Sequence, residues 1–127
     1  MLDQCMVTPV RDEVRSAYQA PYPDQPLTIG SRAFTQLLPT RADNPMLADN
    51  WRAWRMLETF AKPFLTLYGD QDIVAPTAHR SFRERVPGAA GQPHAILAGG
   101  GHFLQEDVPE AYNQALVAWL RATGAGR

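Results

Sequence analysis

The chain has 127 residues, of which 45% are hydrophobic and 20% are charged, and its formal net charge is -1. This length fits one small domain, and the composition argues against disorder, collagen and coiled coil. A near-neutral charge supplies no basic surface for nucleic acid or an anionic membrane, so we expect neither as a partner. A lone cysteine, Cys5, excludes an internal disulfide. The free cysteine and the lack of a basic and apolar leader segment together predict a cytoplasmic location.

The first forty residues predict helices separated by prolines. Thr8 is expected to cap a helix over about residues 9–18, with proline at its first position. The prolines within 20–24 break this helix, because each pushes the preceding residue away from the helical region. A second helix is expected over 27–38. Residues 1–8 show no clear period, and we expect them to be either disordered or the stub of something larger.

The remainder predicts an α/β arrangement. After a third helix over about 46–61, residues 64–69 form a short apolar run that is typical of a strand in a parallel sheet. A helix over 76–86, a second strand over 94–97 and a last helix over about 109–120 follow. This order predicts two parallel strands with a right-handed crossover. Two strands alone leave open edges, so we expect either a further part of the sheet or self-association through an exposed edge.

Ionisable residues follow each predicted strand. Asp70 and Asp72 come after the first strand, and His102 comes after three glycines beyond the second. Ligands bind at the carboxyl ends of strands in open α/β sheets, so an aspartate and His102 are expected to meet there. A carboxylate beside one ring nitrogen leaves the other free to act as a base. Both types of residue also serve simply as turn or exposed residues, and spacing alone leaves that alternative open. The histidines lack metal-ligand spacing, so no metal or other cofactor is expected.

Three short strings stand in the chain in this order: AYQAPYPD at 17–24, GDQD at 69–72 and GGGHFLQED at 99–107. In this order and spacing they resemble the haloalkane dehalogenases of the α/β-hydrolase superfamily, over about residues 10–122. The resemblance implies the C-terminal half of an α/β-hydrolase fold, with two parallel strands, flanking helices and the remnant of a helical cap. Residues 1–40 would be the end of the cap segment, and residues 41–127 would belong to the core.

The resemblance also implies hydrolysis of a carbon–halogen bond in a small apolar substrate. In that family an aspartate displaces halide to form an alkyl-enzyme ester, and a histidine activates the water that hydrolyses the ester. Carried onto this sequence, His102 is the general base and Asp72 its carboxylate partner, with Asp70 in reserve. The substrate-binding residues implied by the resemblance are Tyr22, Pro23 and Val74.

The chain departs from the family at the nucleophile. No stretch of it has the form Gly-x-Asp-x-Gly of the strand-to-helix elbow, nor the version with serine. We therefore expect the elbow to lie upstream of residue 1 and the chain alone to be inactive, because losing one triad member costs several orders of magnitude in rate. The alternatives are a fragment of an epoxide hydrolase or of a serine esterase, and a non-catalytic fragment.

Other charged residues are expected to be structural. Arg80, Arg83 and Arg85 would form the solvated face of a short helix. Glu106 and Asp107 would serve the entry of the last helix, where negative charge favours the helix dipole.

Overall fold

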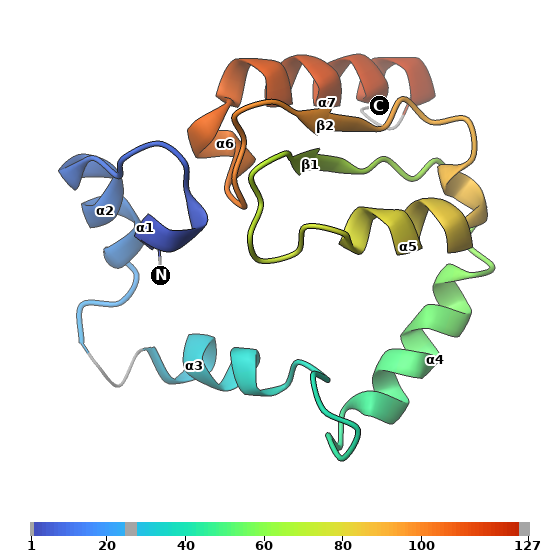
Figure 1. Cartoon of the computed structure of the whole chain (residues 1–127), viewed down its shortest axis with the longest axis horizontal. Helices are drawn as coiled ribbons and strands as arrows, with labels where there is room; N and C mark the ends of the chain where they lie inside the picture. Colours follow the sequence, from blue (N-terminus) through green and yellow to red (C-terminus); the bar gives the residue numbers. More distant parts are fainter. Residues whose placement is uncertain (1, 25–27, 125–127) are drawn as a thin grey trace. The chain divides into compact units, whose positions relative to one another are not determined.

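The computed structural model describes residues 2–24 and 28–124. The chain divides into two compact units, which are Arg11–Leu57 on the one hand and Met1–Val10 with Glu58–Arg127 on the other. Figure 1 shows the helices and strands of each unit, coloured by their position in the sequence. The sequence predicted a cap segment over residues 1–40 and a core over residues 41–127. That division describes which parts of the family's fold the residues match, and not which residues pack together, so it stays a prediction.

The unit Arg11–Leu57 is helical. Its first helix, α2, is Asp12–Gln19, and acidic residues in its first turn favour the helix dipole. The predicted helix start directly after Thr8 is therefore wrong by three residues. The reason is that Thr8 donates its backbone N–H to the Asp107 carboxylate at 2.7 Å, and its hydroxyl also binds that carboxylate instead of capping a helix.

Among the described residues of this unit are two more α-helices, α3 at Ile29–Gln36 and α4 at Leu47–Leu57. The predicted start of the second helix at Leu27 lies outside the described residues. The Asn44 side chain accepts the Met46 N–H at 2.8 Å just before α4 begins. Neither α2 nor α4 buries a residue, and large apolar side chains of the unit stay exposed, Phe34 at 68% among them.

The second unit contains a two-stranded parallel sheet, as the sequence predicted. Strand β1, Leu67–Gly69, pairs with β2, Ala95–Leu97, from Leu67 opposite Ala95 to Gly69 opposite Leu97. Between them lie helix α5, Ala78–Arg85, and the short 3-10 helix η2, Pro87–Ala89. The pairing is shorter than predicted because the His94 side chain, rather than a neighbouring strand, receives the Thr66 N–H, at 3.1 Å.

Two α-helices follow β2. Helix α6, Leu104–Asp107, was not expected from the sequence, and helix α7, Pro109–Thr123, was. Proline stands in the first turn of α7, and Gly124 ends it in the left-handed conformation at φ 69°. Helix α7 packs beside β2 (Figure 1). A short helix α1, Leu2–Cys5, lies in the segment whose sequence showed no clear period.

A partly buried polar network joins the strands at the end opposite the loops described below. Arg83 donates from Nε to the Thr66 hydroxyl at 2.8 Å, so the prediction that it lies on a merely solvated helix face is wrong. Thr66, 4% exposed, donates its N–H to His94 Nδ1, and His94 Nε2 lies 2.8 Å from the Ala89 carbonyl. Because Nδ1 accepts, His94 is the neutral tautomer with its proton on Nε2.

Four buried apolar residues form the described core of this unit. Val86 and Ala89 are each 2% exposed, Leu104 is 7% exposed and Cys5 is 8% exposed. Within residues 2–24 and 28–124, no helix is long and apolar enough to cross a membrane.

Candidate active site

Glycine backbone brings the two loops after the strands into direct contact. A Cβ built at Gly69, the last residue of β1, would lie 2.0 Å from the Gly100 carbonyl oxygen, so only glycine fits there. Gln71 donates its N–H to that same oxygen at 2.9 Å. Asp70 accepts the Gly99 N–H at 2.8 Å, across the gap between the loops. These contacts fix the second loop against the first.

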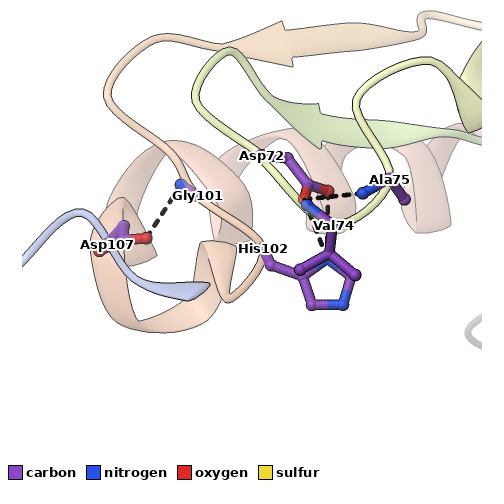
Figure 2. A network of polar contacts seen from close by, with 6 residues as sticks. All are labelled: Asp72, Val74, Ala75, Gly101, His102 and Asp107. Carbon is purple, nitrogen blue, oxygen red and sulfur yellow. Dashed lines mark hydrogen bonds and ion pairs between the residues drawn. The ribbon is translucent and has the colours of Figure 1, made fainter. Parts of the chain in front are cut away.

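The same loops place a carboxylate beside an imidazole. His102 Nδ1 lies 3.1 Å from Asp72 Oδ2 and 3.2 Å from Asp72 Oδ1 (Figure 2). The structure thus brings together the two residues that the sequence placed on neighbouring loops. It also separates the two candidate carboxylates, because Asp70 binds the Gly99 backbone whereas Asp72 faces His102.

A tight turn holds the Asp72 carboxylate in place. Its side chain is only 5% exposed, and its Oδ1 accepts N–H groups from Val74 at 2.8 Å and from Ala75 at 3.1 Å. Burial by itself raises the pKa of this carboxyl. The hydrogen bonds from His102, Ala75 and Val74 outweigh burial, so the pKa of Asp72 lies below its ordinary 3.8. Asp72 is therefore a fixed anion at neutral pH.

The anion determines which nitrogen of His102 carries a proton. A carboxylate only accepts hydrogen bonds, so Nδ1 is the protonated nitrogen. Nε2 has no hydrogen-bond partner in the part of the chain that the structure describes, and 39% of the side chain is exposed. Nε2 is therefore the nitrogen available to take a proton from an outside group.

A shallow cavity of about 230 Å³ adjoins the pair. Leu67, Tyr68 and Leu104 are among its lining residues, together with Asp72 and His102. Burial, with the charge of Asp72 in a second place, raises the pKa of Tyr68, so its hydroxyl is neutral and can donate a hydrogen bond. The walls are thus mainly apolar, and the polar groups are concentrated at the pair. No group of three or more metal-ligating side chains occurs within residues 2–24 and 28–124.

The three predicted substrate-binding residues are not among those that line this cavity. Val74 contacts Asp72 through its backbone N–H, the residue is 53% exposed, and it is not among the residues that line the 230 Å³ cavity. Tyr22 and Pro23 belong to the helical unit, where they line a separate cavity of about 540 Å³. The Tyr22 hydroxyl accepts a hydrogen bond from Ser31 at 3.1 Å. Substrate binding by these three residues stays a prediction.

Asp107 was predicted to serve the entry of the last helix, but its side chain binds the loop that carries His102. It does not cap α7, whose N-cap is Val108. Its Oδ1 accepts N–H groups from Val7 at 3.0 Å and Thr8 at 2.7 Å, and its Oδ2 accepts the N–H of Gly101 at 2.9 Å. No local pattern could have revealed contacts between residues about 100 positions apart.

Comparison with known proteins identifies relatives along nearly the whole chain. It is 41% identical over 113 residues to a haloalkane dehalogenase of Mycobacterium marinum, a stretch that makes up 89% of this chain. The chain is therefore similar to part of a haloalkane dehalogenase. The haloalkane dehalogenase of Psychrobacter cryohalolentis is 40% identical over 114 residues, and haloalkane dehalogenase 1 of Mycobacterium tuberculosis is 40% identical over 110 residues.

The chain spans only about 38% of the length of its Mycobacterium marinum and Psychrobacter cryohalolentis relatives, and 36% of that from Mycobacterium tuberculosis. No protein-family model matches it. With the parallel strands and flanking helices, these matches confirm the predicted fold class, which is part of the α/β-hydrolase fold of a haloalkane dehalogenase.

Proposed function

We propose that Asp72 and His102 are the carboxylate and the general base of a haloalkane dehalogenase triad. The hydrogen bond of 3.1 Å between His102 Nδ1 and the buried Asp72 carboxylate carries this proposal. It leaves Nε2 as a base beside a mainly apolar cavity. The names of the homologous proteins support dehalogenation as the reaction.

The nucleophile has to come from residues other than these 127, because they contain no Gly-x-Asp-x-Gly elbow. Its carboxylate attacks the carbon that bears halogen, the carbon–halogen bond breaks, and halide leaves with the electron pair. Water then attacks the carbonyl carbon of the resulting ester and gives a proton to His102 Nε2. Asp72 stabilises the imidazolium. The ester breaks into an alcohol and the free carboxylate, and the proton passes to solvent.

The proposal extends to the substrate and the other predicted residues. The substrate is a small apolar halogenated compound, and no cofactor takes part in either step. Tyr22, Pro23 and Val74 are proposed to border the substrate in the complete protein, as their match to family positions implies. The 127 residues alone are proposed to be inactive.

A chimaera tests the proposal. This chain replaces the matching segment of the Mycobacterium marinum relative, and halide release from a bromoalkane is measured. The expected result is continuous release, which His102→Ala limits to about one equivalent per protein and which the isolated chain lacks. A folded chimaera whose halide release is unaffected by His102→Ala would refute the assigned base.

The same chimaera separates the alternatives. An epoxide and an activated ester are offered in parallel with the bromoalkane. Faster His102-dependent hydrolysis of the epoxide would assign the chain to epoxide hydrolase chemistry, and faster ester hydrolysis would favour an esterase. Halide release from the isolated chain would contradict the proposed inactivity.

A further inference from the structure

The backbone of His102 is held from the side opposite Asp72. Its N–H donates to the Cys5 carbonyl at 2.8 Å, and the preceding residue, Gly101, donates to Asp107 Oδ2 at 2.9 Å. In the view of Figure 2, Asp107 and Asp72 lie on either side of the segment that carries Gly101 and His102. The imidazole is therefore attached to a backbone whose two consecutive N–H groups are both bound.

Asp107 also holds the segment that supplies the Cys5 carbonyl. Its other oxygen, Oδ1, accepts the N–H groups of Val7 and Thr8. A single carboxylate thus connects the start of the chain to the histidine loop, with three N–H donors divided between two oxygens. The contact leaves no space, because a Cβ at Gly101 would lie 2.7 Å from the Cys5 carbonyl oxygen and 2.8 Å from Asp107 Oδ2.

The Asp107 carboxylate is itself a stable anion. Burial raises its pKa, but the N–H donors of Thr8, Val7 and Gly101 outweigh that effect and hold the pKa below the ordinary 3.8. Hydrogen bonds to an ionised acceptor are shorter and stronger than neutral ones. A neutral amide in its place offers one acceptor oxygen, and its NH₂ group would face a backbone donor.

We propose that Asp107 is a positioning residue, which fixes the imidazole of His102 against Asp72 by clamping the Gly101 backbone to residues 5–8. The proposal rests on the proposed function of the Asp72–His102 pair. It adds that the site also needs the segment Cys5–Thr8 as part of its scaffold, which the Asp72–His102 pair by itself does not imply. Removal of the clamp frees the loop, and the bond between His102 Nδ1 and Asp72 then opens more often.

The test is the exchange with water of the His102 Nδ1 proton, followed by NMR on the full 127-residue chain. Because 39% of the His102 side chain is exposed, we expect this proton to exchange when the bond to Asp72 opens within the folded protein, so that a global loss of stability alone leaves its exchange rate unchanged. Asp107→Asn is expected to accelerate exchange on the order of tenfold, the effect of weakening a hydrogen bond to a charged group. Glu110→Gln, which removes an exposed carboxylate at the start of α7, is the matched control and is expected to leave the rate unchanged.

Asp72→Asn distinguishes failure of the clamp from failure of the pair. It is expected to abolish the protected Nδ1 signal. If it does so while Asp107→Asn exchanges like the wild type, the positioning role is overturned and the pair stands. If Asp72→Asn leaves the signal protected, the pair and the clamp both fail. If Asp107→Asn does not fold, Thr8→Val removes only the hydroxyl donor, and an exchange rate about threefold faster supports the clamp whereas an unchanged rate overturns it.

Discussion

Replacing Gly69 by alanine perturbs the contact on which the site geometry depends. The new Cβ would lie 2.0 Å from the Gly100 carbonyl oxygen and 2.3 Å from the Gly100 carbonyl carbon, whereas ordinary contact begins at 3.4 Å. The histidine loop therefore has to move by about 1.4 Å. This displacement breaks the Gln71–Gly100 hydrogen bond and shifts the backbone next to His102.

The expected cost follows from these contacts. Forced overpacking costs about 1–3 kcal/mol, and each lost hydrogen bond adds about 1 kcal/mol, so Gly69→Ala is expected to lower the free energy of unfolding by about 3 kcal/mol. Urea unfolding measures this free energy, and the indole signal of Trp119 reports on the unit that contains the site. Gly30→Ala is the control, because a Cβ there meets nothing within 4 Å. That change is expected to be neutral or to stabilise α3 by about 0.5–1 kcal/mol. A Gly69→Ala protein as stable as the wild type would refute the reasoning.

Three further predictions concern charge, the buried network and the sheet edges. The pKa values of Asp72 and Asp107 are both lowered in the folded chain, so their contribution to stability is present above pH 3.8 and is lost as pH falls below it. Urea unfolding measured from pH 7 to pH 2.5 should show that the free energy of unfolding falls less at acid pH for Asp107→Asn than for the wild type. The same pH dependence in both proteins would contradict the lowered pKa of Asp107. Arg83→Met is expected to cost about 1–2 kcal/mol through the lost donor to Thr66, whereas Arg80→Met costs little, and equal costs would argue against the buried network. The strands β1 and β2 each have one edge that is unpaired within the described residues, so light scattering is expected to show concentration-dependent self-association, which a strictly monomeric chain would exclude.

Local sequence patterns predicted the elements that carry the pair. A short apolar run before GDQD and a second before the glycines are signals within a few residues, and they gave two parallel strands with their loops on one edge. The position of Asp72 three residues beyond Gly69 did not by itself separate it from Asp70. That distinction came from the turn, in which Asp72 accepts two backbone N–H groups and faces the imidazole.

The incorrect predictions have a common cause, which is that a side chain has a partner far away in the sequence. Threonine is a residue type that often caps helices, but the N–H of Thr8 donates to Asp107 and α2 begins only at Asp12. Arg83 lies on a helix rich in arginine, but a buried threonine of the neighbouring segment accepts its hydrogen bond. A propensity or a period describes neighbours along the chain and contains no information on such contacts.

The most direct test of the central claim uses the chimaera with His102→Phe. If His102 is the base of the second step, nucleophilic displacement still proceeds, and hydrolysis of the ester stops. Incubation with a bromoalkane should then release one equivalent of halide per protein, and mass spectrometry should show a stable alkyl adduct on the nucleophilic aspartate. Continued turnover by the His102→Phe protein, with no adduct, would contradict the account.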